Sequence, residues 1–223
     1  GAKTEVPELV GTARPDLILL NDGDLAYAKL RLDERSWQTT LDHLADFTDS
    51  QARALLWGAA WDSTRDAEAD PKDFVHLVLK NIATESNATA MMTLLNQLVT
   101  VQSMYLKPEN RAEYKAKIGD ALLKMARDAE AGSEAQLQFL KFTPRFASTP
   151  EHATYLRAIL SGEEKLSGRE IDTDLKWDLL TGLVTLGAAD VAEIDAMLAT
   201  DNTANGQKAA ALAKASVPTA EAK

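Results

Sequence analysis

The hydrophobic periodicity of the chain changes near Asp33, and this change constrains the fold more than any other feature of the sequence. From Asp33 onward, apolar residues recur with a period near 3.6, which is typical of amphipathic helices. Start and stop signals divide this part of the chain into about ten helices. We therefore predict an all-α domain over residues 33–223.

The expected helices are joined by short loops, and this arrangement favours antiparallel packing of neighbours. Asp70 and Pro71 predict a helix start, because proline suits the first helical position. The most apolar helix is expected to begin at Ser86 or Asn87 and to end before Pro108. No strict repeat of fixed length is present, so the pattern predicts an irregular helical-repeat solenoid of HEAT or armadillo type.

Residues 1–32 show a different pattern, which predicts a short β-hairpin ahead of the helices. Residues 17–20 are an apolar run, and residues 21–24 supply turn chemistry. Polar and apolar side chains then alternate over residues 27–32, the period of a half-buried strand. Because two strands alone are rarely stable in water, the hairpin is expected to pack on the helices or to end a preceding β domain. The second possibility makes residues 1–32 the linker from that domain.

Composition excludes several classes of function. The formal net charge of -10 argues against a chain that neutralises the phosphates of nucleic acids or of an anionic membrane. No apolar stretch approaches the roughly 20 residues needed to cross a bilayer, and the first residues lack the pattern of a secretory signal. With no cysteine, disulfides and thiolate metal sites are excluded. We expect a cytoplasmic chain with no nucleic-acid or membrane partner.

No catalytic or metal-binding motif occurs in the sequence. His43, His76 and His152 lack metal-ligand spacing, so each is expected to be an ordinary surface or half-buried residue. Nucleophile elbows and phosphate-binding loops are absent. Asp201 begins a stretch that resembles the start of a calcium loop, but Leu212 occupies the position that requires a bidentate Glu. A turn and helix N-cap is the favoured interpretation there, and we predict no metal site and no catalytic residue in this chain.

The most distinctive group of side chains is Arg53, Trp57, Trp61 and Arg65, which recur every four residues along one helical face. This spacing permits cation–π stacking at each end of the group. One interpretation is a wide buried helix whose Trp rings fill core space while the Arg stems cover them. The other is a wall that faces a ligand. The first interpretation is favoured.

A string near the beginning of the chain resembles a known family. Residues 21–33 look like the stretch by which members of the aminopeptidase N family pass from their β-sandwich domain into a helical C-terminal domain. Tyr27 and Asp33 fit the family pattern, whereas Ala26 and Lys29 replace its Gly and Arg. These departures are similar to the actinobacterial branch of the family.

Three further strings agree with the same family, in the expected order. Residues 53–66 resemble the first helical hairpin of the actinobacterial branch. Residues 162–177 look like the family's loop followed by Asp-Leu-Arg-Trp, with Lys176 in place of Arg. Residues 201–223 are similar to its closing Asp-x-Thr, Gly, Ala-rich, Pro and Lys pattern. The resemblance covers residues 15–223, essentially the whole chain.

The resemblance implies a noncatalytic domain of a larger zinc-dependent aminopeptidase of the gluzincin type. In that family, a Gly-Ala-Met-Glu-Asn segment and an H-E-x-x-H motif with a downstream Glu bind the peptide amino terminus and zinc, and neither string occurs here. Zinc and the water that it activates would therefore belong to a catalytic domain of the same polypeptide. This chain would close over the active site, would help to hold peptide substrates, and should be inactive alone.

The resemblance also implies that basic residues on a concave surface bind the C-terminal carboxylate of the peptide, and Arg53 and Arg65 are the candidates. The alternative function is a stand-alone helical-repeat adaptor that binds a protein through its concave face. An adaptor should begin with a well-formed helical cap, whereas this chain starts with a predicted hairpin. This feature favours the aminopeptidase domain.

Overall fold

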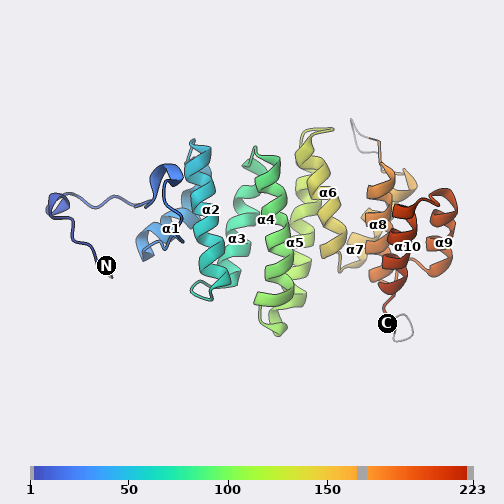
Figure 1. Cartoon of the computed structure of the whole chain (residues 1–223). Coiled ribbons are helices and arrows are strands. Elements are labelled where there is room, and N and C mark those ends of the chain that lie inside the picture. Colours follow the sequence, from blue (N-terminus) through green and yellow to red (C-terminus); the bar gives the residue numbers. More distant parts are fainter. Residues whose placement is uncertain (1–2, 165–169, 220–223) are drawn as a thin grey trace. The chain divides into compact units, whose positions relative to one another are not determined.

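The computed structural model describes residues 3–164 and 170–219, and helices dominate both ranges (Figure 1). Gly168 and Lys223, which belong to two of the family-like strings, lie outside the described residues. The chain divides into two compact units, Gly1–Phe74 and Val75–Lys223. The all-α class predicted from the periodicity is confirmed.

The described residues of the first unit, 3–74, contain two complete α-helices and the beginning of a third. They are α1 (Glu34–His43), α2 (Ser50–Arg65) and the first residues of α3 (Pro71–Asn81), with 3-10 turns at Pro7–Leu9, Asp22–Asp24 and Leu44–Asp46. Asp33 caps α1, where its carboxylate accepts a hydrogen bond from the backbone N–H of Ser36 at 3.0 Å. Such caps satisfy amides that have no partner inside the helix, and they explain why α1 begins where the periodicity changes.

The β-hairpin predicted within residues 1–32 is not found, because the described residues 3–32 contain no strand. The expected turn does form. Asn21 adopts a left-handed conformation with φ 58°, and its side-chain amide bonds both the N–H and the carbonyl of Ala26 at 2.7 and 2.8 Å. Flanking strands would need a sheet or a helix layer to cover them, and Leu25 and Tyr27 remain almost fully exposed. A turn signal alone therefore did not produce a hairpin.

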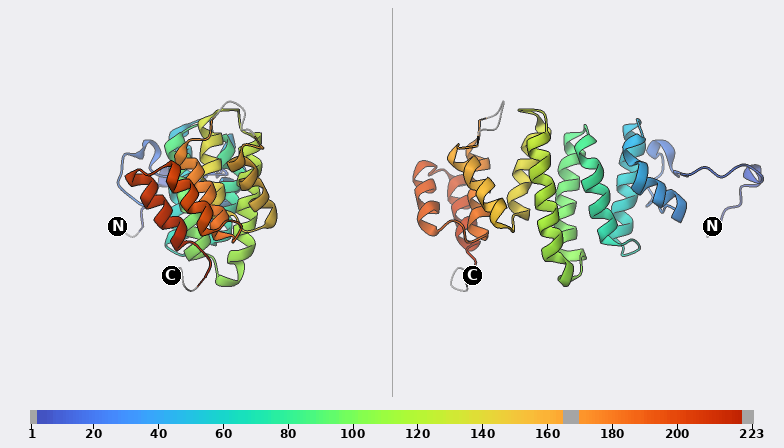
Figure 2. Two further views of the ribbon diagram at one scale, coloured as in Figure 1. Left: turned by 90° about the vertical axis from the view of Figure 1, so that its right-hand side faces the viewer. Right: turned by 180° about the vertical axis from the view of Figure 1, so that it is seen from behind.

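The second unit is a series of helices joined by short connections. After the 3-10 turn Ile82–Thr84 they are α4 (Ala88–Thr100) with the π-helical turn η5 (Val101–Tyr105), α5 (Pro108–Asp128), α6 (Glu134–Phe146), α7 (Pro150–Ser161), α8 (Thr173–Thr185), α9 (Val191–Thr200) and α10 (Ala204–Ala215). Consecutive helices pair as α5–α6, α7–α8 and α9–α10, while α6 contacts both α4 and α8, and α8 contacts α10 (Figure 2). Helices α4, α6, α8 and α10 thus form one continuous row.

Apolar side chains from neighbouring helices fill the space within the second unit. At its C-terminal end, Trp177, Leu180 and Val184 of α8 pack with Ile194 of α9 and with alanines of α10. This burial removes apolar surface from water, which is the main driving force for packing helices together. Among the described residues, no helix combines the length and the apolar character required to cross a membrane.

Candidate functional site

Arg65, a predicted substrate-binding residue, lies at the C-terminal end of α2 among acidic side chains. Its Nη2 is 2.9 Å from Asp62 Oδ1, and its Nε is 3.7 Å from Asp66 Oδ1. The Arg65 side chain is 43% exposed. A cation at this end of a helix also interacts favourably with the helix dipole. Arg65 is therefore paired with carboxylates and still open to solvent.

The Asp66 carboxylate joins the N-terminal segment to the end of α2. Lys29 Nζ lies 2.6 Å from Asp66 Oδ2, and Arg31 contacts both Asp66 and Glu68. The hydrogen bond from Lys29 is the main reason that the pKa of Asp66 lies below its ordinary value. The hydrogen bond to Glu68 likewise raises the pKa of Arg31. A ligand carboxylate at Arg65 would have to compete with these acids.

Arg53, the other predicted substrate-binding residue, holds the turn that precedes α2. Its Nη1 donates to the carbonyl oxygens of Phe47 at 2.7 Å and Thr48 at 3.2 Å. At about 1.5 Å of rise per residue, Arg53 and Arg65 are separated by about 18 Å along the helix. The structure does not bring the two arginines together around one carboxylate.

Of the two tryptophans between these arginines, Trp57 belongs to the interior of the first unit and Trp61 is half-buried. Trp57 is only 6% exposed. The ring of Trp61 packs against Phe74 with 5.5 Å between centroids and an interplanar angle of 55°, a tilted arrangement that aromatic pairs favour. The interpretation of α2 as a helix whose Trp rings fill core space agrees with this packing.

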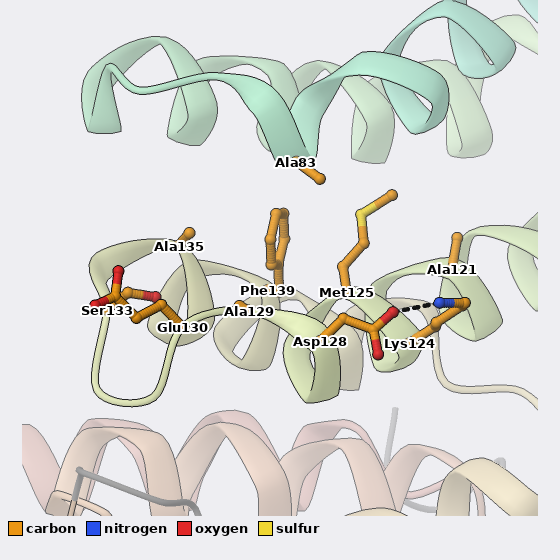
Figure 3. Close-up of a pocket in the computed structure, with 10 residues that line it drawn as sticks. All are labelled: Ala83, Ala121, Lys124, Met125, Asp128, Ala129, Glu130, Ser133, Ala135 and Phe139. Atoms are coloured by element: carbon orange, nitrogen blue, oxygen red, sulfur yellow. Dashed lines mark hydrogen bonds and ion pairs between the residues drawn. The ribbon is translucent and has the colours of Figure 1, made fainter.

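A cavity of about 580 Å³ opens in the second unit between the α5–α6 hairpin and the segment that carries Ala83 (Figure 3). Met125 and Phe139 extend toward Ala83 from the opposite side of the cavity (Figure 3). Its lining residues are Ala83, Ala121, Lys124, Met125, Asp128, Ala129, Glu130, Ser133, Ala135 and Phe139. The volume falls within the range of small-ligand sites.

The rim of this cavity is acidic. Lys124 forms an ion pair with Asp128, and Glu130 adds a second carboxylate. The apolar floor and acidic rim suit an apolar or cationic side chain better than a carboxylate. A second cavity of about 470 Å³ lies beside α8 and α9, where Met197 shares the lining with Lys176, Glu193 and Asp201.

The stretch from Asp201 to Gly206 forms a turn and helix N-cap, which is the interpretation that the sequence favours over a calcium loop. Thr203 caps α10, and its hydroxyl accepts from the N–H of Gly206 at 3.0 Å. The Asp201 carboxylate accepts from the indole N–H of Trp177 and from the Thr203 hydroxyl, both at 2.9 Å. The hydrogen bond from Trp177 is the largest cause of the lowered pKa of Asp201. These contacts explain why Trp, Asp, Thr and Gly occur together in the family-like strings.

The three histidines occupy separate environments. His43 and His76 are exposed, but His152 is fully buried, so the prediction of a surface or half-buried residue was wrong there. His152 Nδ1 accepts from the backbone N–H of Ser148 at 3.1 Å, and Nε2 lies 2.8 Å from Asp120 Oδ1. This pattern places the proton of the neutral ring on Nε2. In the part of the chain that the structure describes, no group of three or more His, Cys, Asp or Glu side chains could hold a metal ion.

Sequence reasoning did not identify the cavity residues of the α5–α6 hairpin. Met125 was recognisable as part of an amphipathic face, but Phe139 carries no local signal of a cavity. The cavity depends on how closely the hairpin approaches Ala83, which is a tertiary property. The small side chains of Ala121, Ala129 and Ala135 are the one sequence feature that could have suggested incompletely filled space between the helices.

Comparison with known proteins agrees with the family-like strings. A family model described as the ERAP1-like C-terminal domain matches residues 17–223. The chain is 42% identical to the aminopeptidase N of Streptomyces lividans over 223 residues, which are 100% of this chain and 26% of that protein. It thus spans about a quarter of the length of this relative. The chain belongs to the family of ERAP1-like C-terminal domains found in aminopeptidase N.

Proposed function

We propose that the chain is the noncatalytic C-terminal domain of a cytoplasmic, zinc-dependent aminopeptidase that removes N-terminal amino acids from peptides. The observation that carries the proposal is that the whole chain aligns with only 26% of an aminopeptidase N. The described residues offer no donor set for zinc, so zinc would be held by the catalytic domain. This chain requires two partners, which are the catalytic domain of the same polypeptide and the peptide substrate.

In this proposal the domain closes over the active site and helps to hold the distal part of the peptide. The continuous row of α4, α6, α8 and α10, backed by the paired helices, supports an irregular HEAT-like or armadillo-like solenoid over residues 33–223. Solenoids present extended concave surfaces that suit long ligands. Closed over the active site, such a concave surface would enclose a cavity that admits peptide ends and excludes folded proteins.

Residues 1–32 would complete the preceding β domain. Their exposed apolar side chains support this role, since Leu20 is 61% exposed and Leu25 is 92% exposed. Exposed apolar groups in a contiguous segment are typical of a surface that another structure covers.

Arg65 is the better candidate for the C-terminal carboxylate of the peptide. Arg53 already donates to two backbone carbonyls, whereas Arg65 is exposed and bound to carboxylates that a ligand carboxylate could replace. An Arg–carboxylate pair of this kind is charge-assisted and can be bidentate.

A chimaera tests the proposal. This chain would replace the matching quarter of the Streptomyces lividans aminopeptidase N, and the chimaera would be compared with the same enzyme truncated before that quarter. We expect kcat/KM for an octapeptide to be at least about tenfold higher in the chimaera, because remote binding of the peptide contributes to the rate. Equal values for the two proteins would contradict a role in holding the substrate.

The Arg65→Ala substitution in the chimaera tests the carboxylate site. We expect KM for an octapeptide with a free C-terminus to rise about three- to tenfold, the effect of losing one charge-assisted contact. The same octapeptide with an amidated C-terminus is the control, and its KM should not change. A rise of the same size for both peptides would remove Arg65 from this role.

A further inference from the structure

Helix α4 and the turn η5 form a segment without any charged side chain. Residues 86–106 contain no Asp, Glu, Lys or Arg, although 26% of the chain is charged. One side of this segment is core, since Met91, Leu95 and Leu98 are buried. The opposite side faces solvent, where charged residues are normally the most frequent.

The solvent-facing side of this segment combines small polar residues with methionine. We name it the α4 face, and it consists of Met92, Thr93, Asn96, Thr100, Ser103 and Met104. Met92 is 45% exposed and Met104 is 69% exposed. The spacing of these residues places them on one side of the helix, so they form a continuous uncharged strip.

The polar groups of the α4 face direct their donors inward. The hydroxyl of Thr93 donates to the carbonyl of Thr89 at 2.8 Å, and that of Ser103 donates to the carbonyl of Val99 at 2.7 Å. Asn96 Nδ2 donates to the carbonyl of Met92 at 3.0 Å. Because the hydroxyl donors of Thr93 and Ser103 are used within the helix, their oxygen lone pairs remain available as acceptors, and Asn96 adds its Oδ1 acceptor and a second amide N–H. The face is therefore a neutral surface of flexible thioethers and polar groups in which hydrogen-bond acceptors outnumber free donors.

Other helices in the same row do not share this property. Lys141 and Arg145 are charged residues of α6. Burial raises the pKa of the Asp178 carboxyl on α8, and the charges of Arg145 and Lys141 oppose that rise. Lack of charge is thus specific to α4 and is not a general feature of the row. Depletion of charge together with enrichment of methionine is typical of the central part of a binding surface.

We propose that the α4 face binds the main chain of an extended peptide substrate without selecting its sequence. This inference rests on the proposed function. A peptide main chain is uncharged and presents N–H donors, which match outward acceptors on a face without charge. Methionine side chains adapt to varied neighbours and recur on surfaces that bind many ligands.

A transient ligand fits this face better than a permanent protein interface does. Permanent interfaces resemble a protein core and bury large apolar side chains, whereas the exposed apolar groups here are mainly those of Met92 and Met104. The hydroxyl groups of Thr93 and Ser103 already donate within the helix when no ligand is bound. The face can therefore remain in water between binding events.

The five methionines of the chain supply a direct test. The full 223-residue chain, labelled with ¹³C at the methionine methyl groups, would be titrated with an acetylated and amidated decapeptide of alternating alanine and glutamine. We expect the Met92 and Met104 resonances to shift, and a second decapeptide with valine in place of alanine to act in the same way. The Met91, Met125 and Met197 resonances should stay in place.

The other methyl groups report the competing sites. Met125 and Met197 line the two cavities, so shifts confined to either of them would place the peptide there and overturn the proposal. The absence of any shift at peptide concentrations of about 5 mM would also overturn it, because that limit excludes even millimolar affinity.

A matched pair of substitutions adds a second test. Thr93→Lys introduces a charge in the α4 face and should weaken binding of the decapeptide by about tenfold, equivalent to about 1.4 kcal/mol. Thr154→Lys on α7 is the control, because Thr154 is also exposed and also donates to a carbonyl four residues earlier, at 3.0 Å. Equal affinities of the two variants would contradict the proposal.

The chimaera separates this inference from the proposed function. If Thr93→Lys leaves decapeptide binding unchanged while the chimaera still exceeds the truncated enzyme, the α4 face is excluded and the proposed function stands. If Met92 and Met104 shift while the chimaera gains nothing over the truncated enzyme, peptide binding at α4 stands and the enzymatic role is excluded.

Discussion

Replacing Gly206 with alanine is expected to lower the free energy of unfolding by about 3 kcal/mol, which places it among the more damaging single substitutions. A Cβ atom at this position would lie 1.9 Å from the carbonyl oxygen of Asp201 and 2.6 Å from its Oδ2. Asp201 cannot move away freely, because its carboxylate bonds the indole of Trp177 and the hydroxyl of Thr203. Thermal unfolding should show a loss of roughly 6–12 °C in Tm for a domain of this size.

The matched control is Gly58→Ala in α2. A Cβ atom at Gly58 meets no atom within 4 Å, and alanine is favoured over glycine inside a helix by roughly 0.5–1 kcal/mol. This variant should keep or raise the Tm. Similar losses in both variants would show that the contact with Asp201 is not the reason for glycine at position 206.

The substitution His152→Ala is expected to destabilise the chain by about 3 kcal/mol, since it combines a cavity with a broken hydrogen-bond network. The buried ring accepts from the N–H of Ser148 and faces Asp120. It also packs directly on α5, because a Cβ atom at Gly119 would be 2.6 Å from His152 Cε1. The midpoint of urea unfolding measures the loss.

His76→Ala controls for the loss of an imidazole. His76 is exposed on α3, and surface substitutions usually change stability by less than about 0.5 kcal/mol. An unfolding midpoint of His152→Ala that equals that of His76→Ala would contradict the structural role of the buried histidine.

Helix boundaries could be predicted because they depend on a few neighbouring side chains. Asn87 was one of two expected starts of α4, and its side chain does accept from the N–H of Ala90. Pro71 begins α3, as the sequence predicts. A capping residue acts on amides within one turn of the chain, so its effect can be inferred from a short stretch of sequence.

Features that depend on distant partners could not be predicted in the same way. The period-two pattern over residues 27–32 suggested a strand, but a strand also needs a neighbour to pair with, and the described residues contain no strand. The burial of His152 requires α5 and α7 to meet at Gly119. Neither requirement is encoded in local spacing.

The candidate substrate-binding arginines show the same difference between features that local sequence determines and features that depend on distant partners. The sequence places Arg53 and Arg65 on one helical face. Only the structure shows that Arg53 donates to two backbone carbonyls and that Arg65 pairs with two carboxylates. The absence of charged residues over residues 86–106 is visible in the sequence alone. It became informative only when the structure showed which side of α4 is exposed.

The most direct test of the central claim is the size of the native polypeptide in the source cell. An antibody raised against this chain would recover the protein, and mass spectrometry would identify the peptides of the recovered band. The account predicts a product several times larger than 24.2 kDa, with upstream peptides that contain H-E-x-x-H. A free product near 24.2 kDa would contradict the account and would favour a stand-alone helical-repeat adaptor.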